Sequence, residues 1–502
     1  MNKLNKIQAR ILTAFNQNRL CLFMQRYGGL FVSAWIGVTA IVALATRIFL
    51  VPFRVSLNYN EGWNAFHAVH AYSSVVPFYP SLDASISNNY PPLSFYIVGG
   101  IGQIFRDNII TGRIISLLSL LVIAICIGWI VMSKSSHFVA GILAGLVFLA
   151  TFTLRYYGYV AMNDPQLFAH AIQIIALVWL FRSNNRRSLV GISILMAVSI
   201  LIKHNLLALP TAIAVWLLFY KRRSGYVFIA ITIGIVIASF TLFYVIYGSD
   251  FLIGILKAPR TYSFREGYLK IKDWLMPQCG LIVIGLFIVV THWREHKIQC
   301  IGLFAMFALL LGAAIAGGAG VNYNAVFDVT IALSLLSGFA IASFDDERIR
   351  QWGSRYPWNL TMSQLTIAII LSLNIMLLGF KCRGLILESI NTTYQPKQLA
   401  ATSEANIALI ASYKDPVVCE EAALCYWAGK TWEMDLFNVQ QKLATGSLVE
   451  SDLIHRIENR EFSLFVVNIK SERLTEPMSR AIKTHYEKFR SSVSYEFWRP
   501  RS

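Results

Sequence analysis

The chain has 502 residues, of which 56% are hydrophobic and 14% charged, and its formal net charge is +17. Average soluble proteins contain about 45–50% apolar and about 25% charged residues. The composition therefore excludes an ordinary soluble protein, because so few charged side chains could not cover the surface of its core. The apolar residues are gathered in blocks near the length of about 20 residues that spans a bilayer as a helix.

We predict a polytopic membrane protein with about eleven transmembrane helices. The predicted spans lie near residues 29–50, 113–132, 138–154, 166–181, 188–202, 205–220, 226–248, 279–291, 298–316, 325–343 and 362–380. The two spans between 188 and 220 are short and close, so they predict a tight hairpin. Segment 91–105 is short for a span and indicates an interfacial helix or a twelfth span. We expect the first span to be an uncleaved start-transfer helix, because no small-residue cleavage site follows it.

Basic residues in the short loops predict the orientation. One set of loops carries Lys134, Arg182, Arg186, Arg187, Lys221, Arg222, Arg223, Arg294, Lys297, Arg348, Arg350 and Arg355, and the basic N-terminal segment 3–26 falls on the same side. The positive-inside rule places these loops in the cytoplasm. The opposite short loops are nearly free of such residues, apart from Arg155 and Lys203. We therefore expect a multi-pass protein of a bacterial inner (plasma) membrane, with a cytoplasmic N-terminus and a periplasmic or extracellular C-terminus.

Residues 381–502 differ in character from the membrane part, 1–380. Two short apolar strands, within 415–430 and 462–470, stand beside a stretch of helical spacing from Lys442 to Arg460, which predicts a small extracytoplasmic α/β domain. This tail holds 16 Lys/Arg and 15 Asp/Glu, so nearly all of the positive charge belongs to the membrane part. Such a distribution suits membrane insertion and anionic lipids and predicts no nucleic-acid partner.

Cys419 and Cys425 lie six residues apart in the predicted extracytoplasmic tail. An oxidising compartment permits a disulfide between them. The spacing is equally compatible with two free thiols, because connectivity cannot be read from sequence.

Two outward carboxylates stand in unusual settings. Glu61 follows the first span within Asn58–His67 and could deprotonate an acceptor hydroxyl; alternatively it is an acidic residue in the first turn of a helix. Asp164 follows a loop with Arg155 and three tyrosines, and Asp-Pro is also an ordinary helix start, with Asp as N-cap.

Lys203 and His204 stand at the outward tip of the predicted hairpin, where a cation suits a phosphate ligand. A lysine that extends toward the headgroups is the alternative interpretation. The loops 88–92 and 317–324 are rich in amides and tyrosines, which suit sugar recognition but are also common in turns. Among these residues, Tyr90, Asn322 and Tyr323 are candidate ligand contacts.

In their order along the chain, these motifs resemble the GT-C glycosyltransferases of the protein O-mannosyltransferase and lipid A aminoarabinose transferase group. The resemblance rests on Asn60-Glu61 after the first span, Tyr-Pro-Pro-Leu at 90–93, Gly112-Arg113, Asp164 and Lys203. It is clearest from about residue 45 to 210.

The resemblance implies an all-α membrane fold that binds a polyprenyl-phosphate sugar and transfers the sugar to an acceptor on the outer face, usually with inversion. The acceptor would be an envelope lipid, polysaccharide or protein. Glu61 would supply the general base and Asp164 the second acidic site. Lys203, with Arg155 and Tyr90, would bind the donor phosphate, and Asn60, His204, Asn322 and Tyr323 would contact the substrates.

The chain departs from the family at two positions. Asn60 stands where the family often has the catalytic Asp, and Tyr90 stands where the aminoarabinose type has a Lys. These departures leave open whether Glu61 or another acid is the base, and keep a non-catalytic scaffold as an alternative. The sequence identifies no cofactor and no cluster of metal-binding side chains, although some members of the family use a divalent cation. A transporter or flippase of a lipid-linked sugar or other envelope component is the rival function; no internal symmetry favours it.

Overall fold

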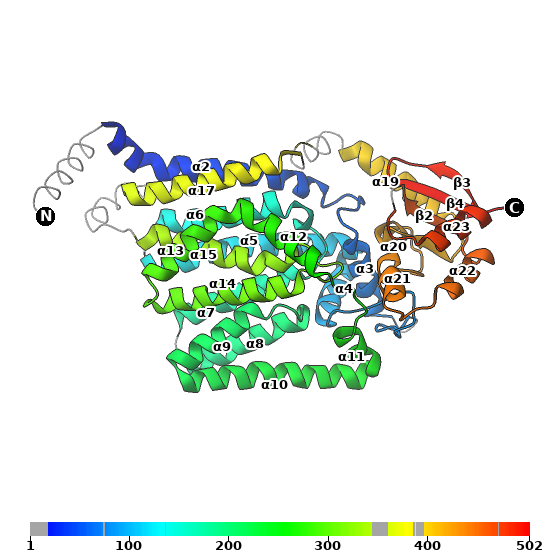
Figure 1. Cartoon of the computed structure of the whole chain (residues 1–502), viewed down its shortest axis with the longest axis horizontal. Coiled ribbons are helices and arrows are strands. Elements are labelled where there is room, and N and C mark those ends of the chain that lie inside the picture. The colour runs from blue at the N-terminus through cyan, green and yellow to red at the C-terminus, as the bar shows by residue number, and fades with distance from the viewer. Residues whose placement is uncertain are drawn as a thin grey trace, which may run out of the picture.

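The computed structural model describes residues 19–73, 76–135, 137–183, 185–343, 360–384, 387, 396–469 and 471–502. Long helices lie side by side in a bundle, and a smaller mixed helix-and-sheet part caps one end of it (Figure 1). The basic residues 3–10 and 348–355, on which the orientation prediction partly rests, lie outside the described residues.

Apolar sequence blocks form the helices of the bundle, and polar loops separate them. The bundle helices are α2 (Arg19–Leu50), α5 (Asn108–Ser135), α6 (Phe138–Arg155), α7 (Gln166–Arg182), α8 (Arg186–Ile202), α9 (Ala208–Tyr220), α10 (Arg222–Tyr247), α12 (Phe264–Leu275), α13 (Cys279–Thr291), α14 (His296–Ile315), α15 (Phe327–Ser343) and α17 (Met362–Lys381). Three shorter helices, α3 (Asn60–His70), α4 (Leu93–Phe105) and α11 (Ser249–Leu256), lie at the capped end (Figure 1).

Among the described residues, eight helical stretches are long and apolar enough to cross a membrane, and α4, α7 and α9 are shorter apolar helices. One of the eight runs from Phe264 to Thr291, so it begins well before the predicted span at 279–291. The multi-pass helical class predicted from the sequence is confirmed. The number of about eleven spans stays a prediction, because length and composition alone do not place α7, α8 and α9 across a bilayer.

Helix α15 forms the centre of the bundle. Every residue from Phe327 to Ala342 is buried, which explains why its sequence is apolar all round rather than on one stripe. Residues of α6, α13 and α14 bury their apolar side chains in the same core. Helix α10, in contrast, is mostly exposed and lies at the edge of the bundle (Figure 1), where a membrane protein faces lipid.

The C-terminal part contains a four-stranded sheet. Strands β1 (Val417–Cys419) and β2 (Leu464–Asn468) pair in parallel, and β4 (Tyr495–Pro500) pairs antiparallel with β2 and with β3 (Tyr486–Ser491), in the order β1-β2-β4-β3. The helices around the sheet are α19 (Pro396–Ala411), α20 (Ala422–Trp427), α21 (Leu436–Ala444), α22 (Glu450–Glu458) and α23 (Glu476–His485). The predicted α/β class of the tail is confirmed, while the domain boundary at 380/381 stays a prediction.

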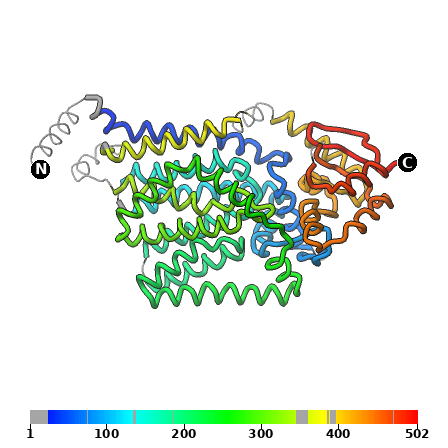
Figure 2. Tube along the Cα trace, viewed as in Figure 1, coloured from blue at the N-terminus to red at the C-terminus, as the bar shows by residue number. Residues whose placement is uncertain are grey.

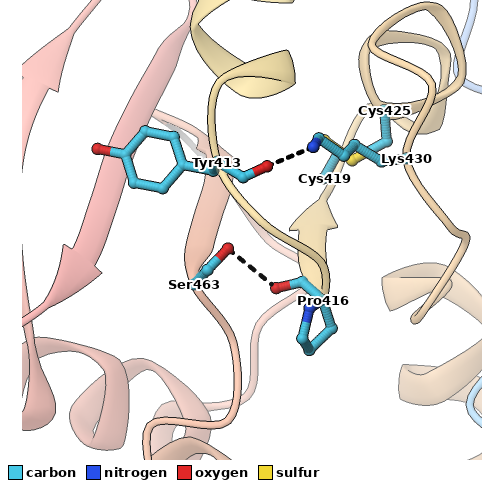
Figure 3. The surroundings of a disulfide bond; sticks show 6 residues. All are labelled: Tyr413, Pro416, Cys419, Cys425, Lys430 and Ser463. Carbon is cyan, nitrogen blue, oxygen red and sulfur yellow. Dashed lines mark hydrogen bonds between the residues drawn. A yellow bond between two sulfur atoms is a disulfide. The ribbon is translucent and has the colours of Figure 1, made fainter.

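Two sequence predictions for the tail are refined by the structure. The stretch Lys442–Arg460 is not one helix, because Gly446 takes a positive φ of 71° after α21 and starts a new turn before α22. Cys419 and Cys425 form a disulfide (Figure 3), which answers the question that their spacing left open. This bond fastens α20 to the end of β1, and in the same view Lys430 donates to the carbonyl oxygen of Tyr413.

The C-terminal part is packed directly onto the loops at the end of the bundle, and the blue and orange segments meet there (Figure 2). Helix α20 lies against α3 so closely that a Cβ on Gly62 would be 2.1 Å from the backbone nitrogen of Ala423. The ammonium group of Lys442 donates to the carbonyl oxygens of Ala84 and Ile86, at 2.6 and 3.0 Å. The close packing of α20 on α3 and the hydrogen bonds of Lys442 together hold the C-terminal part over the end of the bundle.

Candidate active site

A cavity of about 440 Å³ lies where the bundle loops meet the C-terminal part. Its walls combine the loop before α3, the tip between α8 and α9, the loop before α15, and the start of α21. The lining residues are Asn58, Tyr59, Asn60, Trp63, Asn89, Tyr90, Tyr159, Lys203, His204, Asn205, Arg260, 318–322, Asn324, Asp435, Phe437, Asn438 and Arg473. The cavity therefore gathers Asn60, Tyr90, Lys203, His204 and Asn322, which the sequence analysis named as site residues.

Lys203 ends α8 and is only 2% exposed, so it does not extend to the headgroups as the alternative interpretation supposed. Its Nζ donates to the Tyr90 hydroxyl at 2.8 Å and lies 3.4 Å from each carboxylate oxygen of Asp164. Burial opposes the charge, but Asp164 and Tyr90 outweigh burial and raise the pKa of Lys203. The cavity thus contains a buried ammonium group that remains charged at neutral pH.

Asp164 does not line this cavity; it lies behind Lys203. One of its oxygens also accepts the backbone N–H of Gln166 at 2.8 Å, in the turn before α7, although the N-cap of that helix is Pro165 and not Asp164. His204 is buried beside the same lysine, and burial followed by the Lys203 charge lowers its pKa to about 4. His204 is therefore neutral at pH 7, and the positive charge at this wall comes from Lys203.

The cavity lining from the α11–α12 connection and the C-terminal part carries two arginines and a carboxylate. Arg473 places its guanidinium 3.5 Å from the centre of the Tyr59 ring, and Arg260 donates to the Asn438 side chain at 2.5 Å. Asp435 accepts a hydrogen bond from the Tyr59 hydroxyl at 2.5 Å and from the backbone N–H of Asn438 at 3.1 Å, so it also caps α21. Three cations against one carboxylate give the described lining a net positive charge, which suits an anionic ligand.

Buried polar atoms in folded proteins almost always have hydrogen-bond partners. Three buried atoms of the cavity lining lack one among the described residues: Arg473 Nη1, His204 Nδ1 and Asn205 Oδ1. They come from the C-terminal part and from the α8–α9 tip and line the same cavity, so one ligand with donors and acceptors could satisfy them together. Amide, hydroxyl and guanidinium groups are the partners that sugars and phosphates use.

Glu61, predicted to be the base, lies away from the cavity and is completely buried. Its two oxygens accept a bidentate pair of hydrogen bonds from Arg113, at 2.8 and 2.7 Å. The backbone N–H groups of Leu57 and Asn163 donate to the same oxygens, at 2.8 and 3.2 Å. These four donors fill the lone-pair positions of a carboxylate. The geometry therefore favours the alternative, a structural residue in the first turn of α3, and the base assignment stays a prediction without a supporting contact.

Arg155 and Tyr323, predicted as ligand contacts, also lie outside the cavity lining. Both bind the carboxylate of Asp273: Arg155 forms an ion pair with it, and the Tyr323 hydroxyl donates to it at 2.5 Å. Lys381 is a third partner of Asp273, at 2.6 Å. A sequence argument could not find this arrangement, because Arg155, Asp273 and Lys381 are more than 100 residues apart. In this structure Arg155 already has an anionic partner, which it shares with Lys381.

Three cavity residues were missed by the sequence analysis. Arg260 offered a signal, since it is a cation in an outward connection, between α11 and α12. Asp435 and Arg473 offered none, because they reach the cavity only through docking of the C-terminal part. Within the described ranges, no group of three or more His, Cys, Asp or Glu side chains is arranged to hold a metal ion.

No protein-family model matches the chain, and no curated protein matches its sequence. In structure it is similar to ArnT from Cupriavidus metallidurans, with a TM-score of 0.58 to both the apo state and the state bound to undecaprenyl phosphate, at 12% and 14% identity. Each comparison covers 93% of this chain and 97% of ArnT. The Archaeoglobus fulgidus oligosaccharyltransferase tethered with an acceptor peptide is similar with a TM-score of 0.51 and 10% identity, over 96% of this chain and 75% of that one. The chain therefore shares the overall fold of ArnT and of this oligosaccharyltransferase, in line with the resemblance that its motifs indicated.

Proposed function

We propose that this protein is a glycosyltransferase that moves a sugar from a polyprenyl-phosphate donor to an acceptor on the outer face of the membrane. The observation that carries the proposal is the cavity, whose lining combines cations with buried polar atoms that have no partner among the described residues. The similarity to ArnT bound to undecaprenyl phosphate supports the donor class. We place the cavity on the outer side of a bacterial inner membrane, with the N-terminus in the cytoplasm.

The donor phosphate would bind at Lys203, next to the Tyr90 hydroxyl. A buried ammonium group interacts more strongly with a phosphate than an exposed one, because water does not screen it. As the bond between the anomeric carbon and the phosphate oxygen breaks, the phosphate keeps the electron pair, and Lys203 stabilises the growing negative charge. Asp164 would keep Lys203 charged and oriented, which is a positioning role.

The proton of the acceptor hydroxyl would pass to Asp435. In an inverting reaction the acceptor attacks the face of the sugar opposite the leaving phosphate, so the base belongs on the wall opposite Lys203. Asp435 is the carboxylate of the described cavity lining, and it comes from the C-terminal part, whereas Lys203 comes from the bundle. Its Oδ2 accepts only from the Asn438 side chain among described donors, which leaves one lone pair for the acceptor proton.

Matched carboxamide variants test this assignment. Asp435→Asn should lower turnover by about 10²–10⁴-fold with donor affinity within a few-fold of wild type, which is the signature of a lost general base. Asp164→Asn should mainly weaken donor binding. If Asp435→Asn is active, Asp435 is not the base. If Glu61→Gln or Asp164→Asn then loses turnover at normal donor affinity, the acid replaced in that variant is the base, and the candidate acids named from the sequence would be the right ones.

Detergent solution separates a transferase from the rival transporter or flippase. Transfer needs no gradient, so the purified protein should glycosylate an acceptor in detergent. A protein that only translocates its ligand would consume no donor under these conditions.

A further inference from the structure

A second cavity, of about 560 Å³, is lined by residues at the helix ends that lie remote from the C-terminal part; Figure 1 shows where these helices end. The ends of α7 and α9 and the starts of α8 and α10 form it. Apolar side chains make up its deeper wall, including Leu189, Ile192, Leu217 and Val227. It shares no residue with the candidate active site.

Three polar side chains of the cavity lining are available to bind a ligand. Trp216 lines the cavity and is only 9% exposed, yet its indole N–H has no hydrogen-bond partner among the described residues. Arg186 and Arg223 also line the cavity, and neither forms an ion pair with a residue that the structure describes. Buried indole N–H groups normally find a partner, so a ligand atom that accepts a hydrogen bond would suit Trp216.

We infer that this cavity binds an anionic phospholipid of the adjacent leaflet, with the headgroup phosphate at Arg186, Arg223 and Trp216. The apolar wall decides between a lipid and a free phosphate ion, because it offers an acyl chain a surface that an inorganic ion cannot use. The location agrees, since basic residues at the ends of spans lie at headgroup depth. The loop charges make this the cytoplasmic leaflet. The inference does not depend on the proposed transferase activity.

Native mass spectrometry of the purified full-length protein in detergent tests the inference. Dioleoyl phosphatidylglycerol and dioleoyl phosphatidylcholine are titrated separately, and inorganic phosphate is added as a competitor. Wild type should retain phosphatidylglycerol at least about tenfold more tightly than phosphatidylcholine, and the double variant Arg186→Gln/Arg223→Gln should lose about tenfold or more of that affinity. Trp216→Phe, which removes the N–H donor and keeps a smaller aromatic ring, should weaken retention a few-fold.

The control is Arg187→Gln/Arg294→Gln, which removes the same charge from the same end of the bundle at exposed positions that do not line the cavity. This variant should bind phosphatidylglycerol with an affinity within about twofold of wild type, because it reduces only the long-range attraction between the positively charged protein and the anionic lipid. Equal losses in both double variants would mean that no defined site exists. The inference would also be overturned if the two lipids were retained equally, or if inorganic phosphate displaced phosphatidylglycerol when added at the same concentration as the lipid.

Discussion

Replacing Lys203 with methionine removes the cation of the proposed donor site while keeping most of the side-chain volume. The substitution has two effects that must be separated. It deletes a charge-assisted contact with the donor phosphate, worth about 1.5–3 kcal/mol, or about 10- to 150-fold in affinity. It also leaves Asp164, whose side chain is 8% exposed, without its cationic partner, and such an uncompensated buried charge costs about 3–5 kcal/mol of stability.

A second substitution distinguishes the two effects. Lys203→Met/Asp164→Asn removes both charges, so most of the lost stability should return, because a neutral pair needs no compensation. Donor binding should stay about 10-fold or more below wild type in the same double variant. Melting temperature and binding of a polyprenyl-phosphate sugar in detergent measure the two quantities on one sample. If the double variant regains wild-type donor affinity, Lys203 is only a structural partner of Asp164, and the phosphate assignment is wrong.

Three further predictions concern the framework of the site. Glu61→Gln should lower the stability of the purified protein by about 3–5 kcal/mol, because Arg113 would then be buried without a counter-charge; an unchanged melting temperature would contradict this. Gly62→Ala should loosen the docking of α20 on α3 and speed limited proteolysis of the C-terminal part, whereas Gly158→Ala, where a Cβ meets nothing within 4 Å, should not. Burial raises the pKa of the Glu421 carboxyl from 4.5 to about 7, so the folded state binds more protons between these values and loses stability as the pH rises through them. Glu421→Gln should therefore stabilise the protein by on the order of 2–3 kcal/mol at pH 8 and far less at pH 5, and equal melting shifts at both pH values would contradict the assignment.

The fold was predictable from sequence because each bundle helix carries its own signal. A helix such as α15 is apolar all round since it is buried on every side, and polar loops mark where such helices end. The β3-β4 hairpin was missed because its strands mix charged and apolar residues and leave much of the hairpin exposed. The number of spans could not be fixed, because α7, α8 and α9 are shorter than a typical span.

The site was predictable only where its residues belong to local motifs. Lys203 and Tyr90 stood out as polar residues in short outward loops, and they do meet across 113 residues of sequence. Glu61 stood out equally, but sequence could not reveal that Arg113 neutralises it. Asp435 and Arg473 become cavity residues through tertiary docking alone, which no spacing in the chain encodes.

The central claim is tested most directly by measuring both products of transfer. The purified protein is mixed in detergent with a polyprenyl-phosphate sugar and an envelope extract as acceptor, and mass spectrometry follows free polyprenyl phosphate and the glycosylated acceptor. We expect the two products to appear in equal amounts without any ion gradient, and Asp435→Asn to slow the formation of both by about 10²–10⁴-fold. If folded wild-type protein binds the donor but releases neither product, the claim that this protein is a glycosyltransferase is contradicted.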